Sequence, residues 1–159
     1  MKAISVRQPW ADLIRLKLKR LEIRSWTTEY RGDVLICASR EWDSFKFRAM
    51  GASPADAEKY PVGVAVCLAR LAKVRPYRNT LDDYKASGGV IWKRGLRAFE
   101  LEDIEAVAPT PVRGQLGLFS VPWEVSRKPA VPCPVTPGCP GAGMDGDGRE
   151  AVCGCPGGS

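Results

Sequence analysis

The stretch that decides the fold is residues 17–38, KLKRLEIRSWTTEYRGDVLICA. Apolar and polar residues alternate over 21–24, which is typical of a strand with one buried and one polar face. Residues 31–33 read Arg-Gly-Asp, which predicts a turn. Residues 34–38 are all apolar, which predicts a strand buried on both faces. The sequence therefore predicts a polar strand followed closely by a core strand.

The rest of the first 126 residues predicts short strands and few helices. Large and small apolar residues alternate over 62–69, and the alternation reverses after Arg70, which indicates a bulge. No regular strand–helix–strand alternation is present, so we predict an α+β domain, a small, mainly antiparallel β-barrel with flanking helices. The expected strands are 3–6, 21–25, 34–38, 62–74, 98–101 and 115–121. The expected helices are 8–18, 42–50 and 80–86, with a further short helix capped by Ser53-Pro54.

The composition changes near Ser126. Residues 128–159 contain 6 Pro, 8 Gly and four of the six cysteines, with no apolar periodicity. Such a segment has too little apolar surface to offset its ordering entropy. We therefore predict a domain over 1–126 and a disordered tail over 127–159. For the tail cysteines we expect reduced thiols and no bound metal, with an all-cysteine zinc site as the alternative; these are Cys133, Cys139, Cys153 and Cys155.

Composition also excludes several classes of protein. The 159 residues include no histidine, which excludes Ser-His-Asp and Cys-His nucleophile systems and His-based zinc proteases. No run approaches the ~20 apolar residues that cross a bilayer, and the first residues lack an apolar stretch of signal-peptide length. We therefore expect a cytoplasmic protein without membrane association.

The charge is concentrated in the predicted domain. Lys and Arg total 24 against 18 Asp and Glu, a net charge of +6, and residues 1–127 hold 22 basic and 15 acidic residues. A basic domain favours nucleic acid or another polyanion as partner. The alternative is a solvated basic face that only aids solubility.

The densest polar signal is residues 19–26, KRLEIRSW. Glu22 and Arg24 share one face of the predicted strand, and Lys19 precedes it. Residues 7–10 lie upstream and Arg31 lies downstream. Without further information, an exposed strand face with salt-paired residues explains this pattern, each pair contributing ~0.2–1 kcal/mol.

Two segments, ISVRQPWADLI and KLKRLEIRSWTTEYRGDVLICAS, together resemble the opening of the ASCH (activating signal cointegrator homology) domain. That family opens with Q-P-W-A at a helix start, then G-x-K-x-x-E-x-R, a tryptophan, and R-G before an apolar strand. Its closing P-V-x-G-x-x-G-L-[WF] resembles residues 111–119. The resemblance spans residues 3–123. It implies a PUA-like fold, a cleft beside the Lys-x-x-Glu-x-Arg segment, and a nucleic-acid or nucleoside ligand.

The sequence departs from the family at three positions. Lys17 replaces the motif glycine, where a left-handed turn or a close approach favours glycine. Cys37 occupies a position that is often histidine. Some bacterial members resemble amidohydrolases of acylated cytidine, with a threonine three residues after the lysine; here Glu22 stands there. The last difference favours binding over catalysis.

We therefore predict a module that binds RNA or single-stranded nucleic acid, as a monomer and without metal or cofactor. Lys19 and Arg24 are expected to contact phosphate, and Trp10 or Trp26 to stack on a base. The alternative is a hydrolase of RNA or a modified nucleoside, with Lys19 and Glu22 as catalytic acid and base. A buried Lys–Glu pair with displaced pKa values would favour the enzyme. The candidate nucleic-acid-binding residues are Arg7, Gln8, Trp10, Lys19, Glu22, Arg24, Trp26, Arg31 and Arg113.

Overall fold

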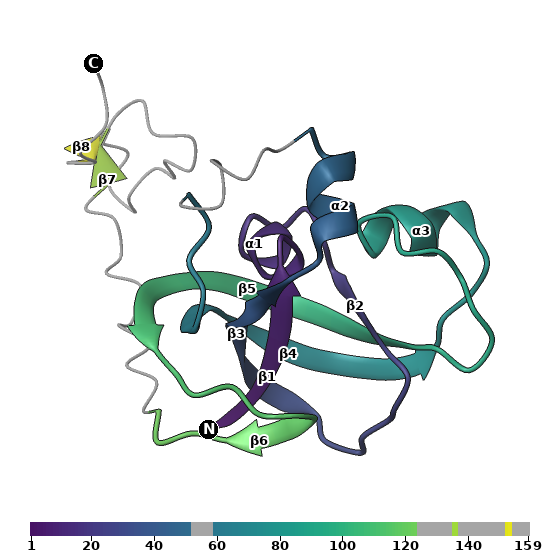
Figure 1. Ribbon diagram of the computed structural model, residues 1–159. Coiled ribbons are helices and arrows are strands. Elements are labelled where there is room, and N and C mark those ends of the chain that lie inside the picture. Colours follow the sequence, from purple (N-terminus) through teal and green to yellow (C-terminus); the bar gives the residue numbers. More distant parts are fainter. Residues whose placement is uncertain (52–58, 124–134, 137–151, 154–159) are drawn as a thin grey trace, which may run out of the picture. The chain divides into compact units, whose positions relative to one another are not determined.

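The structure is a computed structural model that describes residues 1–51, 59–123, 135–136 and 152–153. The chain divides into two compact units, residues 1–123 and 124–159. The first unit contains β1 (Lys2–Gln8), α1 (Trp10–Arg15), β2 (Leu21–Arg24), β3 (Gly32–Trp42), α2 (Ser44–Ala49), β4 (Val64–Pro76), α3 (Leu81–Ala86), β5 (Arg97–Pro111) and β6 (Leu118–Ser120) (Figure 1).

Six strands form one mixed sheet in the order β2-β5-β4-β3-β1-β6. β1 runs parallel to β3, and the other four pairings are antiparallel. The α+β class and the mainly antiparallel pairing are confirmed. The predicted barrel is wrong, because the sheet is open: among the described residues the edge strands β2 and β6 do not pair with each other. These edges are four and three residues long, too short to continue the ladder.

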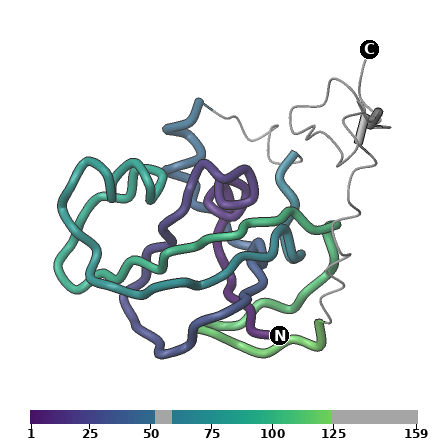
Figure 2. The backbone as a smooth tube through the Cα atoms, turned by 180° about the vertical axis from the view of Figure 1, so that it is seen from behind, coloured from purple at the N-terminus to yellow at the C-terminus, as the bar shows by residue number. Residues whose placement is uncertain are grey.

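The two longest strands account for most of the sheet. Figure 2 shows β4 and β5 running side by side across the unit. Their register shifts between Leu68 and Arg70, and again between Leu71 and Lys73, which confirms the predicted bulge. β5 continues to Pro111, ten residues beyond the predicted end at Leu101, and its second half, IEAVAPTP, is mostly exposed. Small residues and two prolines in an exposed strand give no alternation of apolar and polar residues, so the sequence pattern did not reveal it.

Each helix of the first unit that the structure describes is shorter than predicted, and its end residues explain why. The predicted helix at Ser53-Pro54 lies outside the described residues. α1 ends at Arg15 because Lys17 takes a left-handed conformation, with φ of 61°. The position where the family carries glycine therefore does need a left-handed residue. α2 begins after Asp43, whose side chain accepts a hydrogen bond from the Lys46 backbone, and Thr80 caps α3 in the same way.

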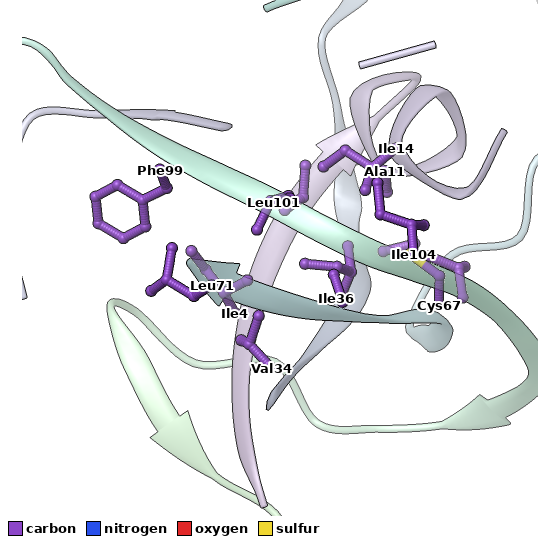
Figure 3. Packing of buried hydrophobic residues seen from close by; sticks show 14 residues of the cluster. Ile4, Ala11, Ile14, Val34, Ile36, Cys67, Leu71, Phe99, Leu101 and Ile104 are labelled. Atoms are coloured by element: carbon purple, nitrogen blue, oxygen red, sulfur yellow. The ribbon is translucent and has the colours of Figure 1, made fainter. Parts of the chain in front are cut away.

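The core lies between α1 and one face of the sheet (Figure 3). Ala11 and Ile14 of α1 pack against a cluster that includes Leu101, Ile104 and Cys67. A second, smaller cluster contains Leu35 and Cys37. Both cysteines of the first unit are buried, as predicted. Burial raises the pKa of Cys37 to about 11 and that of Cys67 to about 12.

Little of the second unit is described. β7 (Val135–Thr136) pairs with β8 (Val152–Cys153) in an antiparallel ladder. The rest of the predicted disordered tail lies outside the described residues, as do Cys133, Cys139 and Cys155. No helix in the described part of the chain is both long and apolar enough to cross a membrane.

Candidate functional site

Lys19 is held inside the protein. The left-handed turn at Lys17 carries the chain from α1 toward β2. The Lys19 side chain is 1% exposed. Its ammonium donates to the backbone carbonyls of Leu21 and Ser87, the latter at 2.9 Å, and lies 3.2 Å from Glu22 Oε2. All three N–H donors of this lysine therefore have partners within the protein.

The carboxylate of Glu22 lies between two cations. Alternation along β2 places Glu22 and Arg24 on the same face of the sheet. Glu22 Oε1 is 3.1 Å from Arg24 Nη2, and Arg24 also donates to the backbone carbonyl of Ser5. Lys19, Glu22 and Arg24 thus form one linked group with a net charge of +1. The sequence placed Glu22 and Arg24 on one face, but the exposed face that the spacing suggested is wrong, because Lys19 and Glu22 are buried.

Burial and the neighbouring carboxylate act in opposite directions on the pKa of Lys19. Removal from water disfavours the ammonium and lowers the pKa of Lys19. Glu22 opposes this effect by raising it, while Arg24 and Lys46 lower it further. Burial is the largest influence, so the pKa of Lys19 lies below its ordinary value. The group thus resembles the buried Lys–Glu pair that favours a catalytic role.

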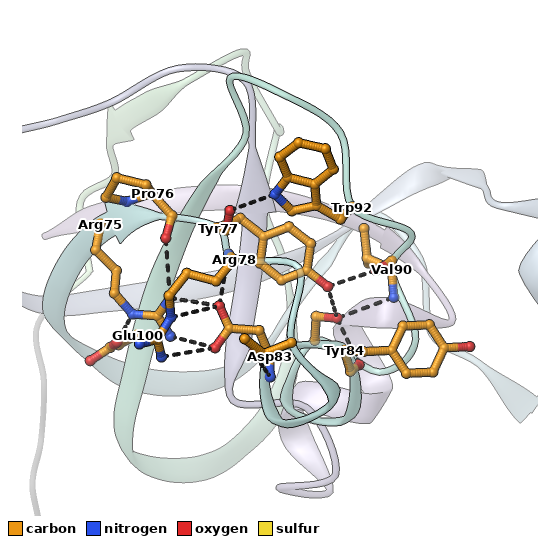
Figure 4. Close-up of polar contacts among 11 residues, drawn as sticks. Arg75, Pro76, Tyr77, Arg78, Asp83, Tyr84, Val90, Trp92 and Glu100 are labelled. Atoms are coloured by element: carbon orange, nitrogen blue, oxygen red, sulfur yellow. Dashed lines mark hydrogen bonds and ion pairs between the residues drawn. The ribbon is translucent and has the colours of Figure 1, made fainter.

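The carbonyl that receives Lys19 is that of Ser87, in residues 87–90, which we call the platform after α3. Polar contacts around Tyr77 and Asp83 hold this platform (Figure 4). Asp83 accepts hydrogen bonds from Arg75 at 2.7 and 2.9 Å and from the Arg78 backbone, which fixes α3 to β4. The Tyr77 hydroxyl contacts Ser87 Oγ at 2.9 Å and donates to the Val90 carbonyl at 2.6 Å. These contacts fix residues 87–90 at the point where Lys19 docks.

Trp10 connects this group to α2. Its indole ring has the ammonium of Lys19 at 5.1 Å and that of Lys46 at 5.0 Å from the ring centroid. The indole N–H donates to Asp43 Oδ2 at 3.1 Å, and Lys46 donates to the Gly88 carbonyl at 2.7 Å. Helix α2 is therefore anchored to the start of α1 and to the platform after α3.

The linked group of Lys19, Glu22 and Arg24, together with Trp10 and Lys46, lines an open cleft of about 1600 Å³. Seven of the nine predicted nucleic-acid-binding residues are brought together there: Arg7, Trp10, Lys19, Glu22, Arg24, Trp26 and Arg113.

Gln8 and Arg31 do not line the cleft. Gln8 is fully buried, donates to the Pro61 carbonyl at 2.7 Å and accepts from the Asp12 backbone at 3.1 Å, so it supports the start of α1. The Arg31 side chain donates to the carbonyls of Thr28 and Tyr30 in its own turn.

The cleft also contains residues that the sequence did not single out. The additional cations are Arg40, Lys46 and Lys93. They come from separate segments without a shared motif, so no sequence signal links them. Three large apolar side chains also line the cleft and are exposed: Phe45, Ile91 and Leu116.

The segment 111–117 forms a further part of the lining, where it passes close to β1. A Cβ atom at Gly114 would lie 2.6 Å from Ser5 Oγ, so only glycine fits without a shift. Ser5 Oγ and Arg24 Nε are buried and have no hydrogen-bond partner among the described residues. Glycine is favoured at position 114 of the closing motif because the backbone there passes close to Ser5 of β1.

An open mixed sheet with a few helices, and a broad cleft lined by the Lys-x-x-Glu-x-Arg residues, define an α+β module. The family model of the ASCH domain matches residues 4–110, and the chain belongs to this family.

Solved structures agree with this assignment. The crystal structure of ASCH from Zymomonas mobilis is 15% identical, with a TM-score of 0.52 over 76% of this chain and 86% of that chain. A tyrosine-to-phenylalanine mutant of that protein is 17% identical, with a TM-score of 0.52 over 76% of this chain and 88% of its own. The comparison with curated proteins gives no match. At these identities the likeness shows the fold.

Proposed function

We propose that the cleft binds single-stranded nucleic acid, RNA in particular. The observation that carries this proposal is the charge of its lining, seven basic residues against three acidic ones. Arg40, Lys93 and Arg113 are exposed in the cleft and make no ion pair within the described part of the chain. Free cations on a concave surface attract a phosphate backbone.

The residues of the cleft have two roles: some contact the phosphates of the ligand, and others position the side chains beside them. Arg40, Arg113 and Lys93 contact phosphate, since none of the three makes an ion pair within the described residues, whereas Arg7 is paired with Glu41. Lys19 acts as a positioning residue, because its three donors already hold Glu22 and two backbone carbonyls. Glu22 in turn orients Arg24, which also lines the cleft.

Fluorescence anisotropy with a labelled ten-nucleotide single-stranded RNA tests the proposal. Log affinity is expected to fall linearly with log salt, with a slope magnitude of roughly 0.7 per phosphate contacted. Lys93→Glu is expected to weaken binding and lower this slope. Lys85→Glu, an exposed lysine of α3 outside the cleft, makes the same change in net charge and is the control. Equal effects of the two substitutions, or affinity indifferent to salt, contradict the proposal.

A second candidate function is hydrolysis of RNA or of a modified nucleoside. The buried Lys19, whose pKa burial lowers, lies 3.2 Å from Glu22 and favours it, because buried ionisable pairs with a displaced pKa are typical of acid–base sites. Glu22→Gln keeps the shape of the side chain and removes the charge. Turnover by the parent protein that disappears in a folded Glu22→Gln variant would support hydrolysis, whereas binding without turnover supports the module.

A further inference from the structure

We propose that Phe45 is the surface on which an unpaired nucleobase stacks. This inference rests on the proposed nucleic-acid function of the cleft. Phe45 is 75% exposed, although it is a large aromatic side chain, and it lines the cleft. A single exposed apolar residue needs no explanation. Phe45 differs because of its position in the cleft, its rigid support and its neighbours.

The two tryptophans of the cleft already have partners. Trp10 is approached by two ammonium groups, and its N–H is bonded to Asp43. Trp26 packs edge-to-face on Phe99, with ring centroids 4.9 Å apart, and belongs to the margin of the core. Phe45 has no ring contact among the described residues. Of the three rings in the cleft, Phe45 is therefore the one with free faces.

Phe45 is presented from a fixed helix. Two residues further on, Phe47 is 7% exposed and packs against Trp42 and Tyr60, with ring centroids 5.0 and 5.4 Å away. Asp43 caps the helix and also binds the indole N–H of Trp10. Anchoring one face of α2 fixes the backbone that carries the opposite ring, so a base that stacks there orders little besides that ring on binding.

Each exposed apolar residue of the cleft lies within three residues, along the chain, of a cation that also lines it. Phe45 precedes Lys46, Ile91 lies two residues before Lys93, and Leu116 follows Arg113 by three residues. Ile91 is 70% exposed and Leu116 fully exposed. A single-stranded nucleic acid presents its phosphates and the faces of its bases side by side. Stacking on an aromatic ring accepts any base, because each base has a π-face. A duplex hides those faces, so the ligand this surface fits is unpaired.

The test compares Phe45→Ala with the parent protein by anisotropy on three labelled probes. These are a ten-nucleotide single-stranded RNA, an abasic oligonucleotide of the same length, and an RNA duplex. Phe45→Ala is expected to weaken binding to the single strand at least fivefold and to change abasic binding less than twofold. Phe45→Trp is expected to retain parental affinity. Leu81→Ala removes a side chain that is 64% exposed and outside the cleft, and it is expected to have no effect.

Each outcome separates this inference from the proposed function. Salt-dependent binding by the parent together with unchanged single-strand affinity in Phe45→Ala overturns the stacking role and leaves the proposed function standing. Equal losses on the single-stranded and abasic probes also overturn it, because the effect then does not come from the base. A parent protein that binds none of the probes refutes the proposed function itself, and the apolar side chains then point to a protein partner.

Discussion

The contact between Ser5 and Gly114 allows a quantitative test of how the closing motif meets the first strand. Gly114→Ala places a methyl group 2.6 Å from Ser5 Oγ, closer than real Cβ contacts. Gly114 is not in the left-handed region, so alanine meets no backbone penalty there. Overpacking costs about 1–3 kcal/mol in a core, and because Gly114 is exposed and the Ser5 hydroxyl can rotate, we expect the lower end of that range, about 1 kcal/mol. The variant is therefore expected to lose that much free energy of unfolding.

Ser5→Ala is the matched partner. The hydroxyl it removes has no hydrogen-bond partner among the described residues, so the single substitution is expected to be nearly neutral. In the double variant the closest remaining atom, Ser5 Cβ, lies 3.6 Å away, an ordinary contact. Replacing glycine by alanine also reduces unfolded-chain entropy, a gain of about 0.4–1 kcal/mol. The double variant is expected to match or exceed the parent in stability.

Urea unfolding followed by tryptophan fluorescence measures all four proteins, and thermal unfolding checks the order. About 1 kcal/mol corresponds to roughly 2–4 °C in Tm for a chain of this size. A Gly114→Ala variant as stable as the parent would refute the steric argument. A double variant as unstable as Gly114→Ala would show that another neighbour causes the loss.

Three further predictions concern stability and reactivity. Lys17 adopts a left-handed backbone conformation that glycine takes without strain, so Lys17→Gly is expected to raise the free energy of unfolding by up to about 1 kcal/mol in urea unfolding. A variant less stable than the parent contradicts the assigned strain. Cys37 and Cys67 have raised pKa values of about 11 and 12, so a short iodoacetamide pulse at pH 8 should leave both unmodified by peptide mass mapping until the protein unfolds. The pKa of Asp83 is held well below its ordinary value, mainly by Arg75. Its stabilisation is therefore present above about pH 4 and is lost as pH falls further. Asp83→Asn should flatten the acid side of the stability profile, whereas the exposed neighbour Asp82→Asn should not.

The predictions from sequence succeeded where a residue's role depends on its near neighbours. Alternation over four residues was enough to put Glu22 and Arg24 on one face, and the change of phase after Arg70 was enough to place a bulge. They failed where the outcome depends on distant segments. Edge pairing decides whether a sheet closes, and no local pattern reports that two short edge strands remain apart. The burial of Lys19 likewise depends on the Ser87 carbonyl, 68 residues away along the chain.

Strand β6 has a consequence for where the domain can be cut. The family match ends at residue 110, yet residues 118–120 pair with β1 along Lys2–Ile4, and the N-terminal ammonium donates to the Val121 carbonyl at 2.8 Å. A fragment that stops at the end of the match would leave the outer side of β1 unpaired, a template for edge-to-edge association. The same fragment would lack residues 111–117, which line the cleft. The first strand thus depends on β6, the last strand of residues 1–123, and a fragment that keeps this pairing includes Val121.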